Sequence, residues 1–169
     1  MRHLLAMALL TPLALGACVE LDPPSPGTSA AVVEARTVFV TRHLQKAQGD
    51  DPSLSDEGAA GAERLADLLA GESIAAIFAT PTRRAMETAA PLAQRMGVAI
   101  THYDPRHPQA LVAAIASANG SVLVVGHSNT VHDLIDRLGG EPPPPLTEQD
   151  YGTVFTIDPT GATSGRELD

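Results

Sequence analysis

The sequence contains no tryptophan, and its few phenylalanine and tyrosine residues bring the aromatic fraction to only 3%. Proteins that stack nucleic-acid bases on aromatic side chains need such residues, so a stacking platform is not expected. The formal net charge of −9 at pH 7 also argues against a general surface for nucleic acid or anionic membranes. No nucleic-acid partner is therefore predicted. Any anionic ligand must be bound by a local cluster of basic side chains.

Cysteine occurs once, at Cys18. A disulfide within the chain is therefore excluded, as is a thiol nucleophile or a cysteine-based metal site in the domain that follows. Residues 1–18, MRHLLAMALLTPLALGAC, have a basic start, an apolar run and then small residues, which is typical of an export signal. The apolar run is too short for a mature membrane-spanning helix.

The segment LGAC, residues 15–18, resembles the lipobox of bacterial lipoproteins. This resemblance implies cleavage before Cys18 and attachment of lipid to its thiol. Val19, rather than an aspartate, follows the cysteine, which favours the outer membrane with the domain facing the periplasm. The alternative is a plain signal peptide in which the cysteine occurs by chance.

The chain divides into four segments on composition. A signal peptide (1–17) precedes a tether (18–35) rich in Pro, Ser, Gly and Ala, which shows no usable periodicity. One domain is predicted over residues 36–158, with a C-terminal tail at 159–169. The length of 169 residues allows one substantial hydrophobic core.

Within the domain, short β-branched runs alternate with longer amphipathic stretches rich in Ala and Leu. This alternation is typical of βαβ units and predicts a three-layer α/β/α sandwich with a mostly parallel central sheet. The last strand, after the breaker EPPPP, is expected at the sheet edge. The predicted strands are 37–41, 75–80, 98–103, 121–126 and 151–157, and the predicted helices are 55–71, 81–97, 108–120 and 128–140.

Ionisable side chains follow the predicted strands where those strands end. Arg42 and His43 come after the first strand, and His127 comes after the fourth. Ligands of open α/β sheets bind beyond the carboxyl ends of the strands, so we expect these side chains to converge. Arg83 and Arg84 open the helix after the second strand, where helix amides also favour anions. The sequence therefore predicts a pocket for a phosphate or a similar oxyanion.

Four motifs, TRH (41–43), LSDEGAAGA (54–62), ATPTRRAMETA (79–89) and VVGHSNTV (124–131), resemble in order and spacing those of the histidine phosphatase superfamily, which is phosphoglycerate mutase-like. The resemblance covers residues 37–158. It implies that His43 is the phosphorylated nucleophile, that Arg42 and Arg84 bind phosphate, and that His127 is the second histidine of the phosphate pocket. Arg83 is the weaker choice of the adjacent arginine pair.

The resemblance implies a phosphatase that hydrolyses phosphomonoesters or phosphohistidine through a phosphohistidine on His43, without a cofactor or metal. The partner is then a small phosphorylated substrate or a phosphohistidine protein. The alternative is a non-catalytic envelope lipoprotein that binds a phosphorylated ligand in the same pocket.

Several positions depart from the family pattern or leave alternatives open. Leu44 stands where the family usually has Gly or Ala, so its side chain either narrows the pocket or points away. Asp104 is a candidate acid for the leaving group, with a solvated aspartate as the alternative. Lys46, the only lysine, lies at the pocket mouth or in solvent. Ser128 and Asn129 are expected to cap the helix after His127, with a substrate contact as the alternative.

Lipid attachment at Cys18 makes a direct prediction about partitioning. The unaltered protein should fractionate with envelope membranes, whereas Cys18→Ala should not, because the acyl chains supply the membrane affinity. Cell fractionation and immunoblotting of the two proteins measure this. Equal partitioning of both proteins would contradict the lipoprotein interpretation.

Overall fold

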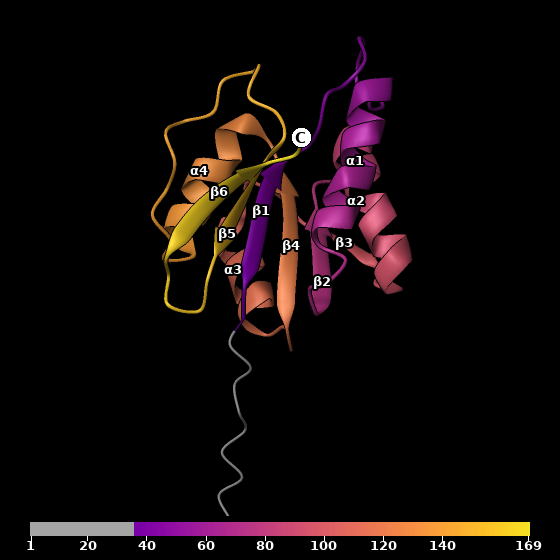
Figure 1. Ribbon diagram of the computed structural model, residues 1–169. Coiled ribbons are helices and arrows are strands. Elements are labelled where there is room, and N and C mark those ends of the chain that lie inside the picture. Colours follow the sequence, from indigo (N-terminus) through magenta and orange to yellow (C-terminus); the bar gives the residue numbers. More distant parts are fainter. Residues whose placement is uncertain (1–35) are drawn as a thin grey trace, which may run out of the picture. The chain divides into compact units, whose positions relative to one another are not determined.

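The computed structural model describes residues 36–169 (Figure 1). The predicted signal peptide, the tether and Cys18 lie outside the described residues, so lipid attachment stays a prediction. In the described part of the chain, no helix is long and apolar enough to cross a membrane.

Six strands form one sheet in the order β3-β2-β4-β1-β5-β6. The strands β3, β2, β4 and β1 pair in parallel, whereas β5 is antiparallel to β1, and β6 is antiparallel to β5. The parallel part of the sheet confirms the prediction, and the last two strands add an antiparallel hairpin. Their bounds are β1 (Val38–Arg42), β2 (Ile74–Ala79), β3 (Ile100–His102), β4 (Ser121–Gly126), β5 (Thr153–Ile157) and β6 (Thr163–Glu167).

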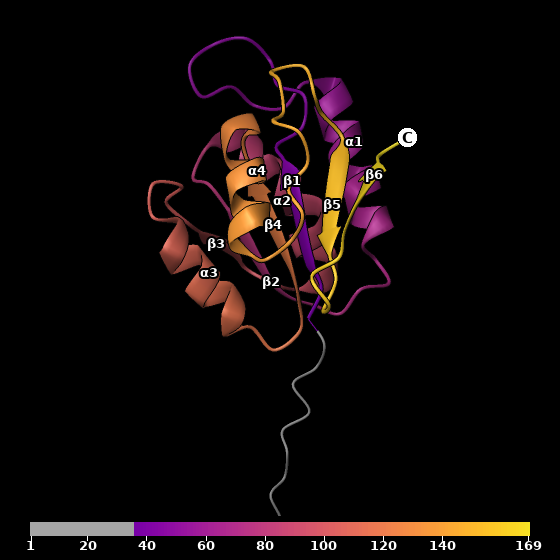
Figure 2. The ribbon, with the colours of Figure 1, turned by 90° about the vertical axis from the view of Figure 1, so that its left-hand side faces the viewer.

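Four helices cover the two faces of this sheet, α1 and α2 on one face and α3 and α4 on the other (Figures 1 and 2). Their bounds are α1 (Asp56–Leu68), α2 (Arg83–Met96), α3 (Pro108–Ala116) and α4 (Ser128–Arg137). The architecture is the predicted three-layer α/β/α sandwich.

Alternate side chains of the central strands build the two halves of the core. In β1, Phe39 packs with the layer of α1 and α2, whereas Val40 packs with α3 and α4. The same alternation separates Leu123 from Val124 in β4. Because both faces are covered, these strands are apolar almost throughout, as a buried parallel sheet requires.

Local signals explain where the helices begin and end. The Ser55 hydroxyl accepts a hydrogen bond from the Gly58 amide at 3.2 Å and caps α1. Pro108 occupies the first turn of α3, where its missing N–H costs nothing. Gly97 ends α2 in the left-handed conformation, with φ of 65°.

The C-terminal end differs from the prediction. Strand β5 is internal, because β6 pairs along its outer side and forms the sheet edge. Residues 163–167 were expected within a C-terminal tail. They carry few apolar side chains, TSGRE, so their strand follows from pairing with β5 rather than from a hydrophobic pattern.

Candidate active site

The two histidines of the predicted pocket follow neighbouring parallel strands. Strand register aligns Arg42 of β1 with Gly126 of β4. A histidine directly follows each of these strands. The His43 amide donates to the Gly126 carbonyl at 2.9 Å. The two imidazole rings lie 5.3 Å apart between centroids, at 68° to one another. The predicted convergence of His43 and His127 is thus present.

His43 is buried, with 3% of its surface exposed, and its ring is held by one backbone contact. Its Nδ1 lies 2.8 Å from the Leu44 carbonyl oxygen. A carbonyl only accepts, so Nδ1 carries the proton and the lone pair of the neutral ring lies on Nε2. Burial, and to a lesser extent the positive charges of Arg42 and Arg84, lower the pKa of His43 to about 4, against the raising effect of the Leu44 contact.

His127 is held by the end of the neighbouring strand β2. Its Nε2 lies 2.9 Å from the Thr80 hydroxyl, which is itself 3.2 Å from the Thr82 hydroxyl. Burial lowers the pKa of His127 to about 4, and Arg84 and Arg42 act in the same direction. Both histidines are therefore neutral at ordinary pH.

His127 also occupies the N-cap position of α4, and its amide donates to the Thr130 hydroxyl at 2.9 Å. The prediction that Ser128 and Asn129 cap this helix is therefore wrong. The helix begins at Ser128 itself, so Ser128 and Asn129 belong to its first turn and line the pocket.

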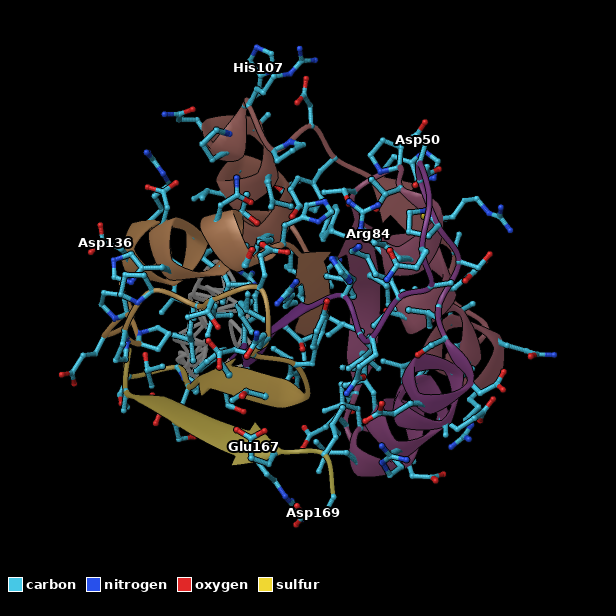
Figure 3. The ribbon with its side chains drawn as sticks, turned by 90° about the horizontal axis from the view of Figure 1, so that it is seen from above. Asp50, Arg84, His107, Asp136, Glu167 and Asp169 are labelled. Carbon is cyan, nitrogen blue, oxygen red and sulfur yellow. The ribbon has the colours of Figure 1, made fainter. Side chains whose placement is uncertain are left out.

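These side chains surround a pocket of about 430 Å³ at the carboxyl ends of the parallel strands. Viewed from that side, Arg84 lies toward the middle of the face, whereas His107, Asp136 and Glu167 lie at its rim (Figure 3). The lining residues are His43, Lys46, Arg84, His127, Ser128, Asn129 and Glu148. The sequence analysis placed Lys46 either at the pocket mouth or in solvent. In the structure its exposed side chain lines this pocket.

Arg84 is the arginine of the adjacent pair that faces the pocket. Its side chain is 19% exposed and forms an ion pair with Asp51 at 3.4 Å. Arg83 is 63% exposed and contacts Ser53 and Glu87 outside the pocket. The preference for Arg84 over Arg83 therefore agrees with the geometry.

Arg42 is buried, with 2% of its surface exposed, and does not line the pocket wall. Its guanidinium binds a segment of the loop between α4 and β5, residues 147–151. Nη1 donates to the carbonyls of Thr147 and Asp150, at 2.8 and 3.2 Å. The Tyr151 ring stacks on the guanidinium at 3.9 Å and lies 5.9 Å from the His43 ring. Arg42 thus joins strand β1 to this loop segment.

Glu148 is the pocket residue that the sequence analysis did not identify. Its carboxylate accepts from Arg42 Nη2 at 3.1 Å and from the Ser128 hydroxyl at 2.6 Å. The hydrogen bond from Ser128 has the larger effect and the charge of Arg42 the smaller one. Both lower the pKa of Glu148 and keep it ionised. A single glutamate in a polar loop, 106 residues after its arginine partner, gives no local pattern by which a sequence could reveal it.

Leu44 points away from the pocket. Its side chain is 1% exposed and lies so close to α1 that a Cβ at Gly61 would be 3.1 Å from Leu44 Cδ1. The Leu44 amide donates to the Thr88 hydroxyl at 3.0 Å, which fixes the backbone after His43. A Cβ at Gly58 would likewise lie 2.0 Å from the Gln45 carbonyl oxygen. The glycines of α1 therefore allow the helix to pack against the segment that follows His43.

Asp104 does not belong to the pocket lining. Its carboxylate accepts from Arg106 Nη2 at 2.8 Å and contacts His107 Nδ1 at 3.1 Å. The hydrogen bonds from Arg106 hold the pKa of Asp104 well below its usual range, so it stays ionised. The structure therefore favours the solvated alternative over a leaving-group acid. Over residues 36–169, no group of three or more His, Cys, Asp or Glu side chains forms a metal site.

Comparison with known proteins agrees with this geometry. The sequence model of the histidine phosphatase superfamily (branch 1) matches residues 35–107, which contain Arg42, His43 and Arg84. An uncharacterized protein of Mycobacterium tuberculosis, Rv0525, is 51% identical over 47 residues, which cover 28% of this chain and 23% of that protein. The match thus spans less than a quarter of this curated relative.

Solved structures share the fold. The protein histidine phosphatase SixA, complexed with tungstate, has a TM-score of 0.58 at 21% identity, covering 77% of this chain and 94% of that chain. The mycobacterial glucosyl-3-phosphoglycerate phosphatase Rv2419c has a TM-score of 0.60 at 16% identity, covering 79% and 98%. The family model thus matches the part of the chain that carries Arg42, His43 and Arg84, and the solved structures share the α/β fold of this domain.

The buried histidines make a prediction about pH. Both should titrate near pH 4, measured from the ring signals of His43 and His127 by NMR and assigned with the His43→Ala and His127→Ala variants. An unfolded chain binds these protons from about pH 6.5 downward, so the folded domain should lose stability as the pH falls from 6.5 to 4. Midpoints near 6.5 for both rings would contradict the desolvated site.

Proposed function

We propose that the domain is a phosphatase that transfers a phosphoryl group from its substrate to His43 Nε2 and then to water. The orientation of the His43 ring carries this proposal. Because Nδ1 donates to the Leu44 carbonyl, Nε2 holds the lone pair, and the lowered pKa keeps that lone pair unprotonated. A neutral, oriented imidazole is the nucleophile that a phosphohistidine intermediate requires.

The surrounding cations support phosphoryl binding. Arg84 and Lys46 line the pocket, and the first turn of α4 adds its helix N-terminus at Ser128. Within residues 36–169, the buried Nε groups of Arg42 and Arg84 have no hydrogen-bond partner. Leaving such buried donors unpaired costs stability, and of these two arginines only Arg84 lines the pocket, where its side chain can approach an anionic oxygen. Arg42, Arg84 and His127 would stabilise the charge that spreads over the equatorial oxygens in the transition state.

The reaction consists of two in-line displacements. In the first, the Nε2 lone pair forms the N–P bond while the bond from phosphorus to the leaving group breaks, and the leaving group takes a proton from solvent. In the second, the water oxygen attacks phosphorus and gives a proton to solvent, the N–P electron pair returns to Nε2, and inorganic phosphate leaves. In this mechanism, binding and charge stabilisation come from guanidinium, ammonium and imidazole groups, without a metal ion.

The structural neighbours suggest two kinds of substrate. SixA is described as a protein histidine phosphatase, and Rv2419c as a glucosyl-3-phosphoglycerate phosphatase. Accordingly, we propose for this chain a phosphomonoester or a phosphohistidine as substrate. We also propose that the domain acts in the bacterial cell envelope, anchored through Cys18, on the basis of the predicted signal and the LGAC segment.

Turnover of p-nitrophenyl phosphate by the purified domain, in excess chelator, tests this function. We expect activity with the chelator, no activity in His43→Ala, and a loss of about two orders of magnitude or more in His127→Ala, on the scale of losing a pre-organised donor. His102→Ala is the matched control, because His102 is exposed on β3, and it should retain full activity.

Three results would contradict the proposal. Full activity in His43→Ala would exclude this residue as the nucleophile. Activity that is lost with the chelator and restored by a divalent ion would overturn the metal-free mechanism. Phosphate binding without turnover of any phosphorylated metabolite or phosphopeptide would instead favour the non-catalytic alternative.

A further inference from the structure

We propose that Glu148 determines substrate specificity by limiting the negative charge that the pocket accepts beside the phosphoryl group. Substrates whose leaving group is neutral or cationic near phosphorus are then favoured over those with a carboxylate or a second phosphate there. This inference rests on the proposed function, because it assigns the substrate class of the same pocket.

Glu148 is held in place although its side chain is 76% exposed. One carboxylate oxygen accepts from Ser128 at the start of α4, and the other accepts from Arg42 at the end of β1. The carboxylate therefore bridges two elements that also carry the pocket histidines. An exposed glutamate bound at only one point would move in solvent, whereas two charge-assisted or short contacts define its position.

The backbone around Glu148 is fixed by the same arginine. Arg42 Nη1 binds the carbonyl of Thr147 on one side of Glu148 and that of Asp150 on the other, while Tyr151 stacks on the guanidinium. The Thr147 amide in turn donates to the Asp150 carboxylate at 2.6 Å. Glu148 therefore belongs to a segment whose backbone is held in place by these contacts. Its negative charge has a fixed position on the pocket wall.

The positive and negative charges around the pocket nearly cancel. The cations at the site are Arg42, Arg84 and Lys46, and the carboxylates in contact with them are Asp51 and Glu148. His43 and His127 are neutral at pH 7, because burial lowers the pKa of each to about 4. Three cations against two carboxylates leave a surplus of one positive charge. A phosphoryl dianion already exceeds this surplus.

A second anionic group on the substrate would therefore meet Glu148 without a cation left to compensate it. Like charges a few ångströms apart repel even where one of them is largely exposed to solvent, as Glu148 is, although water screens the repulsion. A neutral leaving group brings no such penalty, and an O–H or N–H group elsewhere on it can donate a hydrogen bond to the carboxylate. Specificity then arises from a repulsive element as well as from binding contacts.

The experiment compares two matched, non-hydrolysable probes, phenylphosphonate and 2-carboxyphenylphosphonate, by calorimetry at pH 7. We expect the unaltered domain to prefer phenylphosphonate. In Glu148→Gln this preference should fall about tenfold, which corresponds to removing one partly screened like charge. Glu148→Asp keeps the charge and should keep most of the preference. The control Asp136→Asn removes an exposed carboxylate at the rim (Figure 3) and should change nothing.

The outcomes separate specificity from a structural role. An unchanged ratio in Glu148→Gln, or an equal loss of affinity for both probes, overturns the proposal, and the equal loss would show that Glu148 only braces the loop. Turnover of phenyl phosphate is measured on the same samples. Its absence would contradict the proposed function, whereas the ratio of the two binding constants tests Glu148 independently.

Discussion

The parallel pairing of β1 with β4 is the constraint on which the site depends. Register places Arg42 beside Gly126, so the residues that follow, His43 and His127, leave the sheet at the same edge. A shift by one residue would turn each side chain to the opposite face and separate the two rings. The apolar, doubly covered strands prevent such a shift, because every alternate residue belongs to one of two cores. The relative position of the two histidines is thus fixed by hydrophobic packing.

A second constraint follows from Arg42, a cation buried at the end of a central strand. Burying a charge is costly unless it is paired and hydrogen-bonded. Here the carbonyls of Thr147 and Asp150, the carboxylate of Glu148 and the ring of Tyr151 provide the compensation. The loop between α4 and β5 is therefore part of the site. The same contacts that satisfy the arginine also place a carboxylate on the pocket wall.

The sequence predicted the elements that have strong periodicity, and therefore the three layers, the parallel strands and the convergence of His43, His127 and Arg84. It missed β6, whose pairing is set by the preceding hairpin strand rather than by apolar residues. It also missed Glu148, because a contact between residues 42 and 148 depends on how a polar loop closes over the sheet edge. The direction of the Leu44 side chain could not be predicted from the sequence, because it depends on where α1 and its Gly61 lie.

Locating the covalent phosphate tests the central claim most directly. During turnover of a labelled phosphate ester, rapid quenching into alkali preserves a phosphoramidate, and peptide mapping then identifies the labelled residue. The orientation of the His43 ring predicts label on His43 alone, with some label remaining there in His127→Ala. Label on His127 or Ser128, or rapid turnover with no labelled residue at all, would contradict the mechanism.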